Sequence, residues 1–129
     1  MDAPTPTRNR FRSALTRLTT SREELHAAAD SERSHRMGGT PCGELSGRGR
    51  VIVAGALRSV TLRPRAGVPA LEAEINDGTG ALSVIWLGRR EIGGVETGRW
   101  IRVEGLVACS GGRKVIYNPR YELLPGPTA

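Results

Sequence analysis

Cysteine is scarce in this chain of 129 residues. Cys42 and Cys109 lie far apart in the sequence, outside any Cys-x-x-Cys pair and without a histidine pair nearby. This spacing excludes a zinc site and gives no disulfide framework. We therefore expect two small apolar side chains in a reducing cytosol, and a protein that uses neither a metal nor another cofactor.

Long hydrophobic runs are missing as well. No apolar stretch approaches about 18 residues, the length that a transmembrane helix needs, and the first residues form no hydrophobic signal region. Apolar residues make up 38% of the chain, which is low for a sequence that is globular throughout, so part of it is expected outside the core. We expect a soluble, cytoplasmic protein without membrane contact.

Aromatic residues make up only 4% of the sequence, and Lys114 is the one lysine among 19 basic residues. The 13 acidic residues leave a net charge of +6. A basic surplus favours polyanionic partners, with nucleic acid first and anionic membrane second. A GC-rich coding sequence also enriches arginine, but such a bias does not explain where the arginines cluster.

The strongest local pattern lies between Leu71 and Leu87, where two runs of alternating apolar residues flank Asp77-Gly-Thr-Gly80. Alternation with a period of two is typical of strands, and an Asp-Gly step between two such runs predicts a β-hairpin. The glycine-rich step is interpreted as a turn, because a phosphate-binding loop would be followed by a helix with a Lys-Ser/Thr pair.

Three further strands are predicted around this hairpin. They are Arg50 to Arg63, Arg99 to Ala108, and a final run from Val115 to Leu123. In the first, the apolar parity switches after Arg58, which requires a kink or bulge, and Gly55 is a suitable place for it. In the last, Pro119 lacks a backbone donor and should mark an edge or a break.

Side-chain parity assigns the faces of these strands. Glu72, Glu74 and Trp100 point outward, so Trp100 is expected to be at least partly exposed. Tyr117 and Tyr121 share the parity of apolar neighbours, which favours packing in the core or at the end of a barrel. The inward set is Leu71, Ala73, Ile75, Leu82, Val84, Trp86, Ile101, Val103 and Val107. Five strands with a gap after the third are the order of an OB-fold barrel.

The N-terminal part has a helical pattern instead. Apolar residues at helical spacing predict one helix from Arg8 to Thr20, and a capping box at Ser21 and Glu24 predicts a second to about His35. The apolar face of the second is thin, so it is either marginal alone or docked on the barrel. The predicted fold is mainly β, a five-stranded OB-fold barrel with an N-terminal helical appendage. The chain divides into a disordered tail (1–7), the helical appendage (8–36), a linker (37–46), the barrel (47–124) and a tail (125–129).

Four segments resemble OB-fold nucleic-acid-binding domains: Gly49 to Leu57, Asp77 to Gly80, Gly98 to Leu106 and Asn118 to Leu123. This group includes the anticodon-binding domains of class II aminoacyl-tRNA synthetases and the wedge domain of the RecG branched-DNA helicase. The chain also looks like a small stand-alone OB-fold protein of high-GC bacteria. Since it has no helicase motor and no synthetase catalytic domain, the resemblance implies binding without catalysis.

OB-folds bind single strands across strands two and three, between the loop that joins strands one and two and the loop that joins strands four and five. Both loops are basic here, since Arg63 and Arg65 lie in the first, and Arg113 and Lys114 end the second. The resemblance implies a path for single-stranded or branched nucleic acid, DNA first and RNA as the alternative. Trp100 either offers a stacking face or covers the N-terminal helix. The predicted binding residues are Arg58, Arg63, Arg65, Arg89, Arg90, Trp100, Arg113, Lys114, Tyr117 and Arg120.

Glu72 and Glu74 stand in the middle of this path, where carboxylates repel phosphate. They can pair with Arg89 or Arg102, accept hydrogen bonds from base amino groups, or indicate that the groove binds protein. The alternative function is therefore a protein-interaction module or accessory subunit, which docks through the N-terminal helices or through the acidic strand face.

An enzymatic function is not expected from this sequence. A nucleophile and base arrangement would need His26 or His35, and both lie on a helix that is predicted to be solvent-exposed. The basic helix with its three apolar residues is also a weak membrane anchor. Packing on the barrel or on a protein partner is the preferred interpretation of the N-terminal region.

Overall fold

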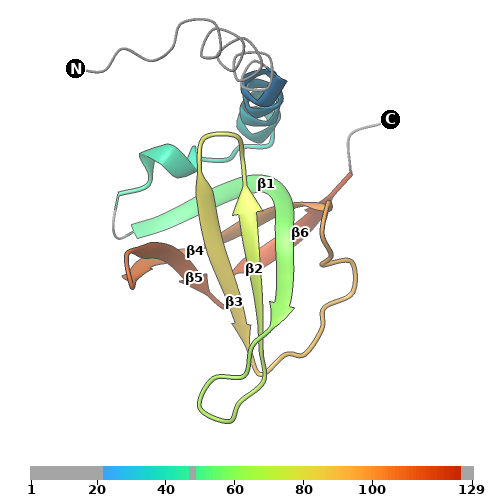
Figure 1. Ribbon diagram of the computed structural model, residues 1–129. Helices are drawn as coiled ribbons and strands as arrows, with labels where there is room; N and C mark the ends of the chain where they lie inside the picture. The colour runs from blue at the N-terminus through green and yellow to red at the C-terminus, as the bar shows by residue number, and fades with distance from the viewer. Residues whose placement is uncertain (1–21, 47–48, 126–129) are drawn as a thin grey trace, which may run out of the picture.

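The computed structural model describes residues 22–46 and 49–125, which form one α-helix and a strand-rich body (Figure 1). The helix covers residues 22–36 of the described part. After it come a 3-10 helix and six strands: η1 (Cys42–Glu44), β1 (Gly49–Leu62), β2 (Ala70–Asn76), β3 (Ala81–Leu87), β4 (Trp100–Ser110), β5 (Arg113–Tyr117) and β6 (Arg120–Leu124). For these residues the prediction of a mainly β protein is confirmed.

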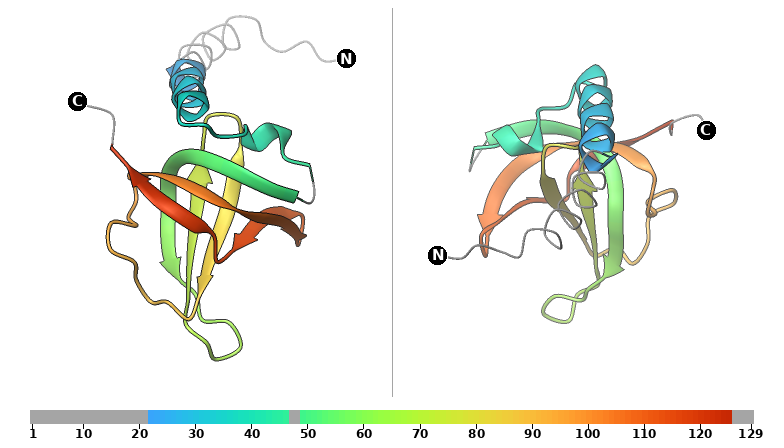
Figure 2. Two further views of the ribbon diagram at one scale, coloured as in Figure 1. Left: turned by 180° about the vertical axis from the view of Figure 1, so that it is seen from behind. Right: turned by 45° about the horizontal axis from the view of Figure 1, so that its top comes forward.

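The strands form one sheet that closes on itself. The strands lie side by side in the order β1, β2, β3, β5 and β4. β4 also pairs with β1, which closes the sheet, and β6 pairs with the start of β4. All pairs are antiparallel except β3 with β5, which run parallel. The views from behind and from above show β1 bending round to serve both sides of this sheet (Figure 2).

The long first strand has the predicted irregularity. β1 pairs with β4 over residues 49–56 and with β2 over residues 56–62, and the register shifts between Leu57 and Ser59. The bulge therefore falls at Arg58, where the apolar parity switches, while β1 passes from β4 to β2 at Ala56, next to the bend predicted at Gly55. Gly55 has a further role, because a Cβ there would come 2.6 Å from the Asn76 carbonyl oxygen of β2.

The interior of the closed sheet is filled by the residues that alternation assigns to it. The inward set of β2, β3 and β4 is buried in one cluster, together with Val53 and Leu57 of β1, and Trp86 is part of it as predicted. Segment 37–46, the predicted linker, contains η1 and also contributes to this core, because Cys42 and Leu45 are buried there.

The last strand departs from its predicted parity. Asn118 has a φ of +49°, and with Pro119 it divides the run into β5 and β6. Ile116 is fully buried in the core, whereas Tyr117 faces the other way with 39% of its surface exposed. The expectation that Tyr117 packs in the core is therefore wrong. Tyr121 is also exposed, but its ring packs edge-on against Trp86 with centroids 5.7 Å apart.

The N-terminal helix ends at residue 36, close to the predicted boundary, and Gly38 follows with a φ of +81°. It docks on the β2–β3 turn. A Cβ on Gly78 would lie 2.1 Å from the Ala27 carbonyl oxygen, so only glycine permits this approach. The predicted tail, the helix expected from 8 to 20 and the capping residue Ser21 lie outside the described residues. Within them, no helix is long and apolar enough to span a membrane.

Trp100 is covered by this helix. Its parity is outward as predicted, but the residue is only 3% exposed, so the expectation of an exposed ring is wrong. The Arg33 guanidinium lies over the indole, with its central carbon 4.8 Å from the ring centroid. The ring packs in a second small cluster with Ala54, Ala56, Leu124 and Met37. The alternative prediction, that Trp100 covers the N-terminal helix, is confirmed, and the helix rather than the strand pattern accounts for the burial.

Candidate nucleic-acid interface

The outward side of β2, β3 and β5, called here the outer face, carries most of the predicted binding residues. Two rows of aligned residues cross β2, β3 and β5 in that order. One row is Glu72, Ile85 and Tyr117, and the other is Glu74, Ser83 and Val115. Ala70, Ile85 and Val115 form a buried apolar cluster on this side, separate from the main core. The exposed side chains of Tyr117 and Leu87 adjoin this floor.

Three arginines converge on Glu72 at this face. Nη1 of Arg113 donates to Oε1 of Glu72 over 3.2 Å, while Oε2 lies 3.9 Å from Nη2 of Arg65 and 4.0 Å from Nε of Arg63. The side chain of Glu72 is 11% exposed, against 66%, 39% and 52% for Arg63, Arg65 and Arg113. We name these four residues the Glu72 cluster.

The predicted outward direction of Glu72 is therefore right, but its partners differ from those expected. Arg102 pairs with Glu122 instead, and no ion pair joins Arg89 to an acid of the described residues. Strand parity alone did not show that the β1–β2 loop folds back over β2. In the structure this loop is closed by hydrogen bonds between Arg65 and Val68 and by the Arg63 N–H donating to the Ala70 carbonyl.

The Glu72 cluster has a surplus of positive charge. Three guanidinium groups against one carboxylate leave +2, and exposed Glu74 is the nearest further acid along β2. Each guanidinium has five N–H donors, and at most one nitrogen of each is directed at Glu72. The remaining donors of these half-exposed side chains stay available to a phosphate group. Arg65 also lies over the Tyr117 ring, with its central carbon 6.0 Å from the centroid.

Arg89 and Arg90 extend this basic region. Both are exposed and directly follow β3, where the Gly88 N–H donates to the Pro69 carbonyl over 2.7 Å. That hydrogen bond places the end of β3 beside the β1–β2 loop, at the end of the sheet away from the helix (Figure 1). The outer face thus has basic side chains from three parts of the chain that are distant in sequence.

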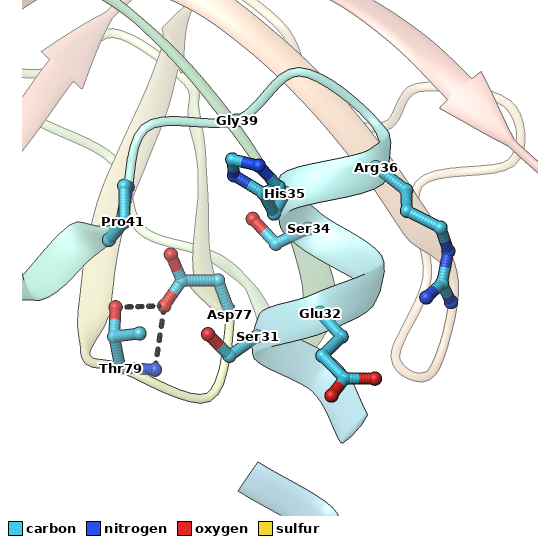
Figure 3. Close-up of a pocket in the computed structure, with 9 residues that line it drawn as sticks. All are labelled: Ser31, Glu32, Ser34, His35, Arg36, Gly39, Pro41, Asp77 and Thr79. Atoms are coloured by element: carbon cyan, nitrogen blue, oxygen red, sulfur yellow. Dashed lines mark hydrogen bonds between the residues drawn. The ribbon is translucent and has the colours of Figure 1, made fainter. Parts of the chain in front are cut away.

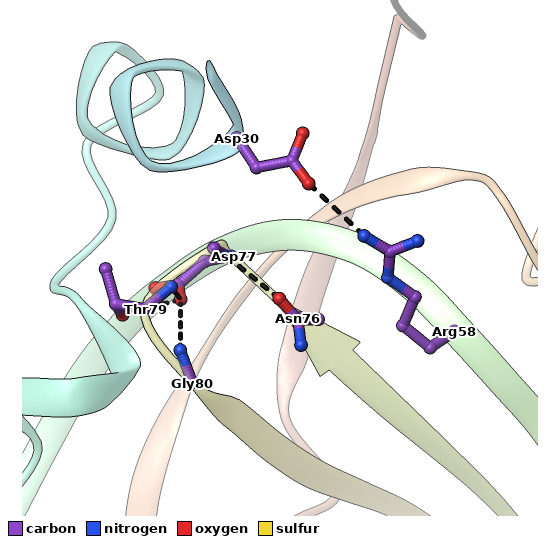
Figure 4. A network of polar contacts seen from close by, with 7 residues as sticks. Asp30, Arg58, Asn76, Asp77, Thr79 and Gly80 are labelled. Carbon is purple, nitrogen blue, oxygen red and sulfur yellow. Dashed lines mark hydrogen bonds and ion pairs between the residues drawn. The ribbon is translucent and has the colours of Figure 1, made fainter. Parts of the chain in front are cut away.

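The other predicted binding residues lie elsewhere. Arg58 is beside the helix, where it pairs with Asp30 over 3.2 Å (Figure 4). The Lys114 ammonium donates to the Leu45 carbonyl and so holds the segment after η1. Trp100 is buried under the helix, and Arg120 lies on β6 opposite Glu104 of β4. The structure therefore brings together Arg63, Arg65, Arg113 and Tyr117, with Arg89 and Arg90 nearby.

At the opposite end of the sheet, the Asp77 carboxylate organises the hairpin turn. Its Oδ1 accepts from the Thr79 N–H (2.9 Å), the Thr79 hydroxyl (2.7 Å) and the Gly80 N–H (3.2 Å), and its Oδ2 accepts from the Cys42 N–H (2.8 Å). Figure 4 shows this network beside the helix. The predicted turn is confirmed, and the same aspartate also ties η1 to it.

A pocket of about 390 Å³ lies between the helix, the segment after it and this turn (Figure 3). Ser34, which lines it, is buried, and its hydroxyl has no hydrogen-bond partner among the described residues. Nearby, burial and then the Asp77 carboxylate raise the pKa of the Cys42 thiol from 9.0 to about 12. A thiol with such a pKa stays protonated at neutral pH and is a poor nucleophile.

Comparison with protein-family models and with curated proteins finds no match to this chain. Among the described residues, no group of three or more His, Cys, Asp or Glu side chains is placed to hold a metal ion. The functional argument therefore rests on the geometry of the outer face.

Proposed function

We propose that this protein binds single-stranded nucleic acid on the outer face of β2, β3 and β5, as a non-enzymatic barrel of the OB type. The observation that carries the proposal is the convergence of Arg63, Arg65 and Arg113 over an apolar floor beside exposed Tyr117. The closed strand order, with its one parallel pair between β3 and β5, supports the barrel type. The sequence resemblance to nucleic-acid-binding OB-fold domains points the same way.

The chemistry divides between phosphate and base. Guanidinium groups of the Glu72 cluster and of Arg89 and Arg90 contact the sugar-phosphate backbone, and each neutralised phosphate releases counterions. Bases stack on Tyr117 and against Leu87, where stacking on an aromatic side chain contributes about 1–3 kcal/mol per base. Affinity then falls as salt rises, because counterion release dominates the binding free energy.

Fluorescence anisotropy of a labelled single strand of about 20 nucleotides, titrated at several salt concentrations, tests this proposal. Replacing Arg63, Arg65 and Arg113 together with serine removes three phosphate contacts. The slope of log K against log salt then decreases by about 2, since each contact on a single strand contributes roughly 0.7. DNA, RNA and branched duplexes are compared in the same assay to define the preferred ligand.

The matched control replaces Arg22, Arg36 and Arg50 with serine. These residues are exposed and lie away from the Glu72 cluster, and their loss changes the net charge by the same amount. The control is expected to keep the slope of the unmodified protein. Equal losses in both triple variants would show that only net charge matters, and absence of binding at low salt would refute the proposal.

A protein-interaction module is the second candidate. The helix and the sheet enclose a groove of about 720 Å³ that is lined by Glu23, His26 and Asp30 from the helix and by Asn76 and Trp100 from the sheet. Leu25 on the same helix is 71% exposed. Recovery of a protein partner from cytosol before and after nuclease treatment separates the two functions. A partner that survives nuclease supports docking, and one that is lost supports nucleic-acid binding.

A further inference from the structure

We propose that Glu72 makes the outer face select guanine among the bases of a bound single strand. The inference rests on the proposed function and adds a base specificity to it. It starts from a buried oxygen atom. Oε2 of Glu72 is inaccessible to solvent and accepts no hydrogen bond, although Arg63 and Arg65 lie about 4 Å away.

Burying a carboxylate oxygen without a hydrogen bond is costly, because that oxygen has lost water and, although Arg63 and Arg65 are near, no donor reaches it within hydrogen-bond distance. Oε1 is held by Arg113, which fixes the plane of the carboxylate. Oε2 remains as an acceptor on β2, one strand spacing from Ile85 on β3 and two from Tyr117 on β5. A ligand that brings a donor to this position removes the cost.

The position of Arg65 indicates the shape of that donor. Its planar guanidinium lies 3.9 Å from Oε2 and 6.0 Å from the centroid of the Tyr117 ring. The guanidinium itself occupies the place between the carboxylate and the aromatic face, so a flat, donor-bearing group fits there when it displaces Arg65. Guanine contains the same N–C–N unit in its Watson–Crick edge, where N1–H and N2–H are adjacent donors. When guanine takes this place, Arg65 is released and can contact a phosphate group.

The other bases match a carboxylate less well. Cytosine and adenine each present one amino group beside a ring nitrogen that is a hydrogen-bond acceptor. That acceptor would face the second carboxylate oxygen, and two acceptors repel each other. Thymine and uracil present one N–H between two carbonyl oxygens. Single-stranded nucleic acids expose these edges to side chains while the base stacks on an aromatic ring. Glu72 is therefore matched by the edge of guanine alone.

Anisotropy titrations with three 20-nucleotide strands test this inference. One is all thymidine, the second carries a single central deoxyguanosine, and the third carries deoxyinosine there, which lacks the N2 amino group. The unmodified protein is expected to bind the guanine strand at least about fivefold more tightly than the thymidine strand, the low end for a bidentate base contact. The inosine strand should fall between them.

Two variants and one matched control locate the effect. Glu72→Gln is expected to reduce the guanine preference to less than twofold, and Glu72→Asp should do the same without a change of net charge, because the shorter side chain withdraws the carboxylate. Glu74→Gln removes the same charge from an exposed position two residues along β2, and it should keep the preference. If Glu72→Gln does not fold, Glu72→Asp and the inosine strand still decide the question.

The outcomes separate this inference from the function on which it rests. Salt-dependent binding of all three strands with equal affinity would overturn guanine selection and leave nucleic-acid binding intact. A preference that persists in both Glu72 variants would also overturn it. Failure to bind any strand at low salt would overturn both proposals.

Discussion

Replacing Asp77 with asparagine is expected to destabilise the protein strongly, although the two side chains have the same shape. Asp77 is fully buried and accepts four hydrogen bonds, three at Oδ1 and one at Oδ2 from the Cys42 N–H. Asparagine offers one oxygen and one NH2 group. If its oxygen keeps the three donors of the turn, its NH2 group faces the Cys42 N–H, and two donors meet.

The size of the effect follows from these contacts. A buried N–H that loses its acceptor costs about 1–3 kcal/mol. The three remaining hydrogen bonds lose their charged acceptor, and charge-assisted bonds are about twice as strong as neutral ones. The sum is about 3 to 5 kcal/mol, a large part of the roughly 5–15 kcal/mol of a typical domain. For a domain of about 100 residues this lowers Tm by roughly 15 °C or more.

Urea denaturation followed by circular dichroism measures this loss. Asn76 and Thr79 flank the turn and stay unchanged, while Glu74→Gln serves as an exposed acid-to-amide control on the same hairpin and should shift stability by less than about 0.5 kcal/mol. A loss below about 1 kcal/mol for Asp77→Asn would refute the assigned network, because it would mean that the turn and η1 do not depend on this carboxylate.

Three further predictions concern the same end of the molecule. Gly78→Ala should displace the helix from the turn, because the new Cβ meets the Ala27 carbonyl oxygen at 2.1 Å, and hydrogen exchange of residues 22–36 should rise well above that of the sheet. In a Cys109→Ser background, Cys42 should be about a thousandfold less reactive toward iodoacetamide at pH 8 than in urea, because its pKa is raised to about 12. Because the folded state holds the Cys42 proton up to about pH 12 and the unfolded state only to pH 9.0, the free energy of unfolding should fall as the pH rises from 9.0 toward 12. A free energy of unfolding that is the same at pH 8 and pH 11 would contradict this.

Local turn chemistry and alternation predicted the central hairpin and the core correctly. Asp77 and Gly78 specify a turn within a few residues, and the inward set of β2, β3 and β4 follows from a period of two, so no distant contact is needed to find them. The same rule failed at Tyr117, because the positive φ of Asn118 breaks the run and the buried residue is Ile116.

Alternation gives the face of a residue but not what covers that face. Trp100 and Glu72 both point outward, and both are buried, one by the helix and the other under three arginines. These covering contacts join residues that are tens of positions apart, and no local pattern encodes them. The approach of Arg63 to Glu72 alone could have been found from the sequence, since Arg63 directly follows β1 and Glu72 lies on β2 of the same hairpin.

The pairing of the charges supports the proposal that polyanions bind at the outer face and not at the protein surface in general. In the ion pairs of the described residues outside the Glu72 cluster, one arginine meets one acid, as Arg58 does with Asp30 and Arg50 with Glu104. Around Glu72 three arginines share one carboxylate, so positive charge accumulates there even though the net charge of the chain is only +6. Within the described residues, the helix lies over Trp100 and Gly78 at the opposite end of the sheet and does not cover the arginine-rich end.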